Sequence, residues 1–532
     1  MQQKLLTNLI ASLLLFLAAC SLQGSPATAV SPSDATSNQP ATPLLQLSST
    51  PMVSEPVVIP STPPTEQAQP EVTKKPKGNR ATRATPGSQG KQGNQGSGAS
   101  QNLPMEVPAH PLDVILGRPT NNSITLSLLS AADQTLSLTY GVGTETRQTE
   151  PIALQANTPR EIALTGLTPD SDYFYSVNAG EKHTFHTARA LDSTFTFDIQ
   201  ADSHLDTNSS LPVYEQTLAN ERADQPDFII DLGDTFMTEK YKPYTDAQPQ
   251  YLAQRYYMGQ AAQSAPFFLV LGNHDGEGAP RGNASTESSD WAAQQRTRYF
   301  PNPLPDSFYS GNATPEPTVG ALQDYYAWTW GDALFVVLDP YWFTPPQKGN
   351  TSDQWNPTLG EAQYKWLKTT LETSQAKWKF IFIHQLIGGF DKNGRGGVEV
   401  AKLYEWGGNN ADGSYGFDAQ RPGWGVPIHQ LLVQNHVTAV FHGHDHLFVK
   451  QELDGIIYQE VPQPSAARSN ATNTAAEYGY TSGNILGSSG HLRLTVTPAQ
   501  VTVDYVRTYL PQDEKTGQQN GQVDYSYTLA NP

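Results

Sequence analysis

Cysteine is almost absent from the sequence, with one residue, Cys20, among 532. A single cysteine excludes any disulfide within the chain, so we expect packing and bound metal to stabilise the folded part. The apolar run from Leu9 to Ala19 is too short to cross a bilayer. Basic residues are few, with 33 Lys and Arg against 51 Asp and Glu. These shortages exclude a disulfide scaffold and indicate an acidic protein.

The N-terminus has the shape of a signal peptide, which we assign to residues 1–19. Lys4 precedes the apolar run, and the run ends at Leu17-Ala18-Ala19-Cys20. This ending resembles a bacterial lipobox, in which the cysteine becomes the lipidated first residue of the mature protein. We therefore predict lipidation at Cys20 and an exported protein that is lipid-anchored in the cell envelope, with the membrane as a partner.

Residues 20–108 are predicted to be a disordered linker, because they are rich in Pro, Ser, Thr, Gln and Gly and almost free of aromatic residues. Such a segment cannot bury enough apolar surface to offset the entropy lost on ordering. Residues 1–108 hold seven Lys and Arg against five Asp and Glu, so this part of the chain carries +2. Because the net charge of the whole chain is −18, the remaining residues carry −20. An acidic folded part disfavours nucleic acid as a partner.

Residues 109–190 show the pattern of an all-β domain. Polar and apolar residues alternate over 123–128 and 135–140, and Gly141 marks a turn. The segment Leu167-Thr-Pro-Asp-Ser-Asp-Tyr-Phe-Tyr175 resembles the tyrosine corner of fibronectin type III domains, and Phe185-His-Thr-Ala188 resembles their closing strand. The resemblance implies a fibronectin type III-like β-sandwich.

Residues 194–510 are predicted to form a larger α/β domain, and residues 511–532 a flexible C-terminal tail. Short runs rich in Phe, Ile and Val read as buried strands. These runs cover 195–201, 228–232, 267–271, 380–383 and 437–441. Residues 359–372 have an approximately helical apolar period and precede another strand, which is the strand–helix–strand order of an α/β sheet. Residues 491–497 and 501–506 predict a closing hairpin. The stretches at about 276–323, 341–358 and 388–427 are expected to be long loops that act as lids or specificity elements.

Five short motifs follow the five predicted strands directly. They are Asp202-Ser-His204, Gly233-Asp234, Gly272-Asn-His-Asp275, His384 and Gly443-His-Asp-His446. Residues at the carboxyl ends of strands meet where α/β sheets gather their ligands, so these motifs are expected to share one crevice. Asp, Asn and His supply oxygen and imidazole ligands, which suit Fe, Mn or Zn in a catalytic site. Each motif alone is weak evidence, but the ordered set indicates a two-metal site that can clamp a phosphoryl group.

The ordered motifs resemble the calcineurin-like metallophosphoesterase superfamily over about residues 194–465. The resemblance implies a two-sheet β sandwich flanked by helices, within an α/β (α+β) fold. It also implies metal ligands at seven positions, with Asp234 bridging two divalent or trivalent ions and one oxygen of its carboxylate facing each ion. One ion is assigned Asp202, His204 and His446, and the other is assigned Asn273, His384 and His444.

The resemblance further implies in-line attack on phosphorus by a hydroxide that the two metals activate, with His274 as the catalytic group that need not bind metal. A β domain before the catalytic domain is similar to the arrangement of purple acid phosphatases. Those enzymes carry a metal-binding Tyr three residues after the bridging Asp, where this chain has Met237. A coloured Tyr-bound ferric centre is therefore not expected. The same position holds the Asp that orients the catalytic His in protein phosphatases, so the partner of His274 is left open.

Two classes of function remain open. The first is a metal-dependent hydrolase of small phosphate esters, with an acid-phosphatase-like phosphomonoesterase favoured over a phosphodiesterase of the same fold. The second is a surface binding or adhesion protein that makes its contacts through the fibronectin-like domain. The complete ligand set favours the hydrolase.

Overall fold

The computed structural model describes residues 107–278, 286–346, 353–389, 393–467 and 471–530. The predicted signal peptide, Cys20 and nearly all of the predicted linker lie outside these residues. All of the described residues fall into one compact unit. Among the helices of the described ranges, none combines the length and the apolar character needed to cross a bilayer.

The first described region is rich in β structure, as the alternating sequence predicts. A three-stranded sheet has the order β1 (Leu112–Gly117), β2 (Ser123–Ser130) and β7 (Arg160–Thr165). A four-stranded sheet has the order β5 (Glu145–Gln148), β4 (Leu138–Val142), β8 (Asp172–Val177) and β9 (Lys182–His186), and β3 (Gln134–Leu136) pairs with β6 (Ile152–Leu154). Apolar side chains of both larger sheets share one core. Tyr173 accepts a hydrogen bond from the backbone N–H of Thr168 (2.8 Å).

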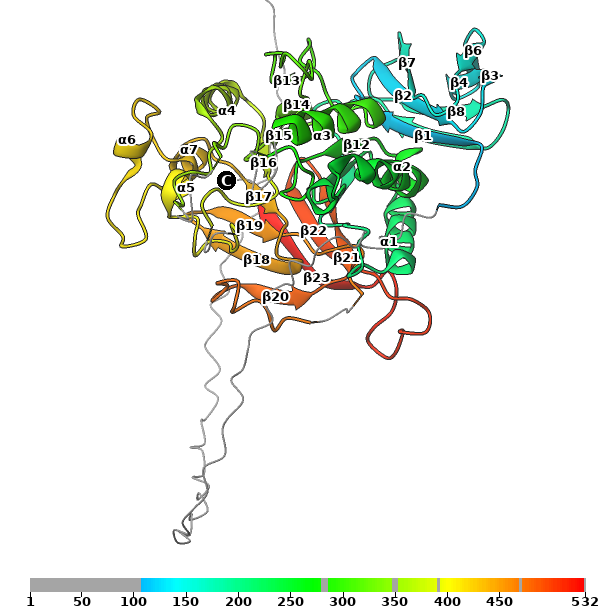
Figure 1. Ribbon diagram of the computed structural model, residues 1–532. Helices are drawn as coiled ribbons and strands as arrows, with labels where there is room; N and C mark the ends of the chain where they lie inside the picture. Colours follow the sequence, from blue (N-terminus) through cyan, green and yellow to red (C-terminus); the bar gives the residue numbers. More distant parts are fainter. Residues whose placement is uncertain (1–106, 279–285, 347–352, 390–392, 468–470, 531–532) are drawn as a thin grey trace, which may run out of the picture. The chain divides into compact units, whose positions relative to one another are not determined.

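The second region is built from two mixed sheets (Figure 1). The six-stranded sheet has the order β12 (Phe267–Leu269), β11 (Ile229–Asp231), β10 (Phe195–Gln200), β21 (Gly490–Val496), β22 (Gln500–Arg507) and β23 (Val523–Ala530). The eight-stranded sheet has the order β13 (Ser310–Gly311), β14 (Tyr326–Trp330), β15 (Ala333–Val337), β16 (Trp378–Phe382), β17 (Ala439–His442), β19 (Ile456–Glu460), β18 (Leu447–Leu453) and β20 (Asn484–Gly487). Strands β10, β11 and β12 run parallel to one another, and so do β15, β16, β17 and β19.

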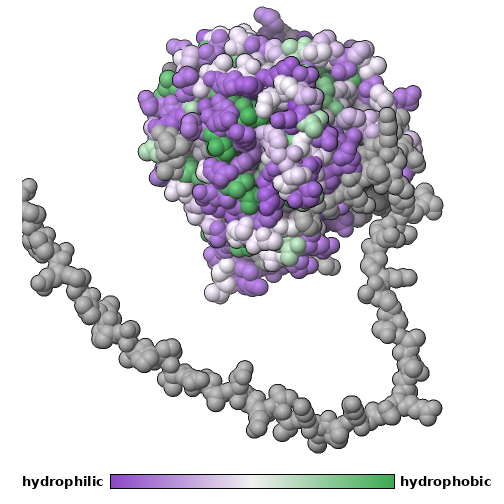
Figure 2. All heavy atoms as spheres, turned by 90° about the vertical axis from the view of Figure 1, so that its left-hand side faces the viewer, coloured by the Kyte–Doolittle hydropathy of each residue, from purple (hydrophilic) through white to green (hydrophobic). Residues whose placement is uncertain are grey.

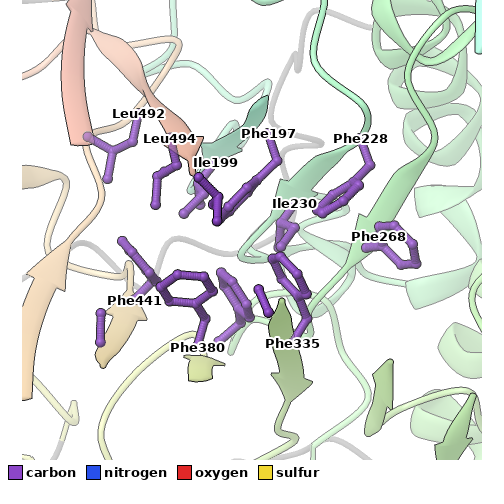
Figure 3. Close-up of a cluster of buried hydrophobic side chains, with 14 of the residues drawn as sticks. Phe197, Ile199, Phe228, Ile230, Phe268, Phe335, Phe380, Phe441, Leu492 and Leu494 are labelled. Carbon is purple, nitrogen blue, oxygen red and sulfur yellow. The ribbon is translucent and has the colours of Figure 1, made fainter. Parts of the chain in front are cut away.

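The two sheets pack face to face through a core dominated by phenylalanine. Figure 3 shows Phe197, Phe228 and Phe268 of the six-stranded side directed toward Phe335 and Phe380 of the eight-stranded side. Each of these rings is fully or almost fully buried, which contributes about 1.5–3 kcal/mol per side chain. This packing explains the Phe-rich runs in the sequence and fixes the two sets of strand ends relative to each other.

Helices cover the outer faces of both sheets. The eight-stranded sheet packs against α4 (Glu361–Thr373), α7 (Ile428–Gln434) and the short α5 (Tyr404–Gly407) and α6 (Phe417–Gln420). The six-stranded sheet packs against α1 (Leu211–Asp224), α2 (Gln248–Ala262) and α3 (Thr286–Tyr299). The face that carries α5, α6 and α7 is mostly hydrophilic, with hydrophobic residues gathered in a short stripe (Figure 2). The fold is therefore the predicted two-sheet sandwich flanked by helices.

The β-rich region packs directly on the helices of the second region. Ile115 of β1 and Leu129 of β2 belong to the same apolar cluster as α2. The buried guanidinium of Arg255 in α2 donates to the Ser127 hydroxyl (3.1 Å) and carbonyl (2.7 Å). The Tyr175 hydroxyl donates to the Gln263 carbonyl (2.7 Å). Apolar burial and satisfied polar contacts thus hold the two regions together.

Two sequence predictions about irregular segments are wrong. The tail after residue 510 contains a strand, because β23 pairs with β22 along its length and places Leu529 in the sheet core. The stretch predicted as a loop over 276–323 contains α3, whose buried face includes Ala292, Ala293 and Arg296. The sequence of α3 is polar and shows no helical apolar period. Its buried face includes an arginine whose charge is paired, because Arg296 donates to both oxygens of Glu277 (2.6 and 2.8 Å).

Candidate functional site

The predicted site residues follow strand ends in both sheets. In the six-stranded sheet Asp202 and His204 follow β10, Asp234 follows β11, and Asn273 and His274 follow β12. In the eight-stranded sheet His384 follows β16, and His444 and His446 lie between β17 and β18. Because β10, β11 and β12 are parallel neighbours and so are β16 and β17, each group leaves its sheet at one edge. The face-to-face packing brings the two edges together.

The backbone at these positions is unusual. Five candidate ligands have positive φ angles, which ordinary L-residues adopt at a cost of about 1–3 kcal/mol. They are Asp202 (61°), His204 (54°), Asp234 (56°), His444 (81°) and His446 (58°). Such strain persists only where the surrounding structure enforces it, and it concentrates at functional sites.

Two glycines of the motifs are required by close approach. A Cβ on Gly272 would lie 2.0 Å from the Asp234 nitrogen and 2.4 Å from its Oδ1. A Cβ on Gly443 would lie 2.7 Å from Asp202 Oδ2. The glycines thus allow the loops that carry Asn273 and His444 to pack directly on the carboxylates of the neighbouring motifs.

The first donor set consists of Asp202, His204 and His446, as predicted. Asp202 Oδ1 lies 3.7 Å from His204 Nε2 and 3.4 Å from His446 Nε2. The other oxygen of Asp202, Oδ2, accepts the backbone N–H of His444 (2.8 Å). One oxygen therefore orients the carboxylate while the other faces the imidazoles.

The second donor set consists of Asp234, His384 and His444, with Asn273 beside it. His384 Nε2 lies 3.4 Å from Asp234 Oδ2, 3.3 Å from His444 Nδ1 and 3.2 Å from Asn273 Oδ1. His384 Nδ1 donates to the Leu232 carbonyl (2.8 Å), which leaves Nε2 free to bind a cation. All seven residues predicted as ligands thus lie in or beside two adjoining donor sets.

Asp234 joins the two sets through a single oxygen. Its Oδ2 lies 3.6 Å from His204 Nε2 of the first set and 3.4 Å from His384 Nε2 of the second. Its Oδ1 accepts the backbone N–H of His274 (2.7 Å). The His274 amide thus orients Oδ1, and Oδ2 is the oxygen that faces an imidazole of each donor set. Whether one oxygen of Asp234 faces each cation stays a prediction.

The chemistry of the donor sets fits metal ions. Within the described residues, Asp202 Oδ1 and His204 Nε2 are buried without a hydrogen-bond partner. Buried polar atoms are normally paired, so two orphans in the first donor set indicate that these atoms serve a cation. Carboxylate, amide and imidazole donors suit Mn, Fe or Zn. The two sets can therefore hold a dinuclear centre.

Charge coupling in the site is strong. Burial opposes ionisation of Asp234, but His384 and His274 outweigh burial and hold the pKa of this carboxyl well below its usual value. Burial lowers the pKa of His384, but the carboxylates of Asp234 and Asp202 outweigh it and raise that pKa to about 9. A proton on His384 therefore competes with a cation for Nε2, so acid weakens metal binding.

The loop that carries Asp234 is anchored by Asp275, the last residue of its motif. Asp275 Oδ2 accepts the N–H groups of Asp234 (3.2 Å) and Gly272 (2.7 Å), and Oδ1 accepts those of Thr235 (2.7 Å) and Phe236 (2.8 Å). Asp275 therefore orients the backbone of the loop that carries Asp234.

The orienting partner of His274, which the sequence left open, is Glu239. His274 Nδ1 and Glu239 Oε1 are in hydrogen-bond contact, and His274 Nε2 lies 3.9 Å from Asp234 Oδ2. Glu239 lies in η1 (Thr238–Lys240), five residues after Asp234. The imidazole thus presents Nε2 to the donor sets while a carboxylate holds its other nitrogen.

A second residue that sequence reasoning missed is Asp206, two positions after His204. Its Oδ2 lies 3.6 Å from His204 Nδ1 and 3.1 Å from Lys240 Nζ. It lies on the ring nitrogen opposite to the one that faces Asp202. Carboxylates in this position orient metal-binding histidines and increase their basicity.

Arg395 lies next to the second sheet's motif. Its Nη1 donates to Asp445 Oδ1 (3.0 Å), and its guanidinium lies 3.9 Å above the ring of Tyr478. Asp445, flanked by His444 and His446, also accepts from the Tyr480 hydroxyl (2.9 Å) and so points away from the donor sets, as predicted. These contacts hold the Arg395 guanidinium near the site, although Arg395 lies in an irregular segment.

His442 is not part of either donor set. Its Nδ1 lies 2.7 Å from Glu460 Oε2, and both side chains are buried. Glu460 also accepts the backbone N–H of Asp445 (2.8 Å). His442 is therefore linked to the loop that carries His444 and His446 through Glu460.

Comparison with known proteins finds a matching family model and similar solved structures. Residues 195–448 match the model of the calcineurin-like phosphoesterase family. The structure of PhoD is similar at a TM-score of 0.57 and 15% identity, over 82% of this chain and 92% of that one. A purple acid phosphatase, PPD1, from yellow lupin (Lupinus luteus) seeds is similar at 0.51 and 15% identity, over 79% and 74%. No curated protein sequence matches the chain significantly.

The structural likenesses, at this level of identity, concern the fold. Together with the family match and the paired donor sets, they show that the chain carries a metallophosphoesterase domain. The protein is a metal-dependent hydrolase of phosphoric esters.

Proposed function

We propose that the protein is a phosphomonoesterase that acts on small phosphate esters at the cell envelope. The observation that carries the proposal is the pair of donor sets joined at Asp234 Oδ2, with His274 Nε2 on the same oxygen. Metal ions held by these sets would neutralise the phosphoryl oxygens and acidify a bound water enough to supply a nucleophile near neutral pH.

His274 is the candidate general acid for the leaving group. Its backbone N–H is fixed on Asp234 and its Nδ1 on Glu239, so Nε2 has a defined direction toward the donor sets. A proton at Nε2 can be given to the departing ester oxygen, a role worth about 10²- to 10⁴-fold in rate. The Glu239 carboxylate orients the imidazole, and one quarter exposure of the ring leaves room for a substrate.

The charge distribution favours a small and doubly charged substrate. Arg395, with a side chain 25% exposed, adds a fixed cation near His444. A monoester dianion gains more from such a cation than a diester monoanion does. The net charge of −20 after residue 108 disfavours long polyanions. A phosphodiesterase of the same fold is the alternative.

The substrate preference is tested with enzyme of measured metal content. A chromogenic aryl phosphate and the corresponding bis-aryl diester are compared by kcat/KM at matched pH. We expect the monoester to be the better substrate. A higher kcat/KM for the diester would show that the protein is a phosphodiesterase and not a phosphomonoesterase. Inactivity on both esters, with two metals bound, would refute phosphate ester hydrolysis.

Envelope anchoring through Cys20 is part of the proposal and rests on the sequence of residues 1–20. In the producing cell, Cys20→Ser is expected to shift the protein from the detergent phase to the aqueous phase of a detergent partition. Unchanged partition would refute lipid anchoring. If wild-type enzyme with both metals bound hydrolysed no ester, a contact function of the β-rich region would become the leading alternative.

A further inference from the structure

A second acidic cluster lies on the outer face of the six-stranded sheet, away from the strand ends. Its donors are Asp198 of β10, Asp224 of α1 and His491 of β21, whose ligand atoms all lie within 4.8 Å of one another. Strand alternation explains this placement. Phe197 and Ile199 point into the core, so Asp198 points to the opposite face, where α1 covers it.

The contacts within this cluster are incomplete. His491 Nε2 lies 2.8 Å from Asp224 Oδ2 and 3.9 Å from Asp198 Oδ2. Asp198 and His491 are both fully buried. In the described part of the chain, neither oxygen of Asp198 and neither oxygen of the neighbouring Glu221 has a hydrogen-bond partner, and the same is true of His491 Nδ1. Four orphaned carboxylate oxygens in a dry layer would each cost free energy unless a cation or a proton served them.

The charge balance also favours a cation. Asp198, Glu221 and Asp224 supply three carboxylates, and of these Arg493 contacts Asp224. Arg493 donates to Asp224 Oδ1 (2.8 Å) and also to Asp504 Oδ2 (2.9 Å), so its charge is shared with a fourth carboxylate. One divalent ion would neutralise most of the remaining negative charge.

The position of two of these carboxylates at the end of α1 adds to the negative charge of the cluster. Glu221 and Asp224 lie in the last turn of α1, where the helix dipole already places partial negative charge. Carboxylates are unfavourable at a helix C-terminus, and a cation is favourable there. The helix thus contributes to the same negative potential as the buried side chains.

We propose that Asp198, Asp224 and His491 bind a third divalent transition-metal ion that is structural and lies apart from the dinuclear centre. Ligand atoms bound at about 2.1 Å to a tetrahedral ion lie about 3.4 Å apart, so the observed 2.8 and 3.9 Å need shifts of only about half an ångström. The ion takes Nε2 of His491 in place of its proton. Arg493 holds Asp224 in orientation.

One imidazole with carboxylates suits Zn²⁺ or Mn²⁺, whereas Ca²⁺ prefers six to eight oxygen ligands. The ion ties the end of α1 to β10 and β21. Because β10 leads into Asp202 and the following loop leads into α1, the third ion stabilises the frame of the first donor set without touching substrate.

The test separates the third ion from the dinuclear centre. In the full chain, Asp234→Asn, His204→Ala and His384→Ala together break both catalytic donor sets and leave the outer cluster intact. After chelation, reloading with Zn²⁺ alone and removal of free ion, elemental analysis of this triple variant should give one ion per chain. Adding Asp198→Asn to the triple variant should abolish that ion, whereas adding Asp504→Asn should not.

Two further outcomes bear on the proposal. In the otherwise wild-type chain, Asp198→Asn should hold one ion fewer than wild type and should lose the Zn²⁺-dependent rise in melting temperature attributable to the cluster. A folded triple variant that binds no Zn²⁺ overturns the proposal, even where Asp198→Asn fails to fold. In that case protons, and no metal ion, neutralise the buried carboxylates of the outer cluster. Since the triple variant has no catalytic centre, its metal content does not depend on whether the hydrolase function is correct.

Discussion

The contact between Glu239 and His274 allows the loss of kcat in a Glu239 variant to be predicted. Glu239→Gln keeps the shape of the side chain but removes the charge that holds His274 Nδ1. The two side chains are 33% and 25% exposed, so the contact is screened more than a buried ion pair would be. A hydrogen bond to a charged group contributes about 1.5–3 kcal/mol. At about 1.4 kcal/mol per decade, kcat should fall by about ten- to a hundredfold.

The assay uses aryl phosphates that differ in the acidity of the leaving phenol. A weakly acidic phenol needs a proton from the enzyme, and a strongly acidic one does not. We therefore expect the loss of kcat in Glu239→Gln to be large for phenyl phosphate and small for a nitrophenyl phosphate, with KM little changed. Asp246→Asn, an exposed carboxylate in the adjoining turn, is the charge-matched control and should behave as wild type.

Two results would refute this reasoning. Wild-type kcat in Glu239→Gln would show that the carboxylate does not support catalysis. An equal loss for all leaving groups, together with lost metal, would show that Glu239 maintains the donor sets and does not act through His274. His274→Ala should give the same dependence on the leaving group with a larger loss, about 10²- to 10⁴-fold.

Further predictions concern the frame of the site. Asp234→Asn should lose metal and activity together, as measured by elemental analysis and by turnover; full metal content would refute the bridging role. Asp275→Asn turns an amide NH₂ toward two backbone donors and should lower the free energy of unfolding by at least about 2 kcal/mol, measured by chemical denaturation. Arg395→Met should lower kcat/KM for a monoester by about tenfold or more and affect a diester less; equal effects would argue against a phosphate contact.

The sequence predicts the centre of the domain well because its signals are local. Each motif follows a short apolar strand, and the strands are recognisable because the core between the sheets is built from phenylalanine. Once the strands are parallel neighbours, the positions of Asp202, Asp234 and Asn273 at one edge follow from topology. The strands and the meeting of the motifs could therefore be predicted, whereas metal binding by these residues stays a prediction.

The residues that support the site could not be predicted in the same way. Glu239 lies in a 3₁₀ turn with no periodic pattern, and its partner is 35 positions away in the chain. Asp206 is close to His204 in sequence, but nothing local shows that its side chain turns back to the ring. The strand β23 did leave a signal, because Val523, Tyr525, Tyr527 and Leu529 alternate with polar residues.

The outer cluster shows why alternation in a strand does not decide exposure. In Phe195-Thr-Phe-Asp-Ile-Gln200, apolar residues alternate with polar ones, a pattern that is also typical of a strand with one face in the core and one face in water, although the Phe-rich run is predicted as a buried strand. The structure confirms the first face, but α1 covers the second and buries Asp198 completely. The helix α1 also brings two more carboxylates to this covered face, and their negative charge must be neutralised inside the protein. Burying these carboxylates costs much free energy without a cation and little with one. We therefore expect Zn²⁺ to stabilise a chain whose catalytic donor sets are broken.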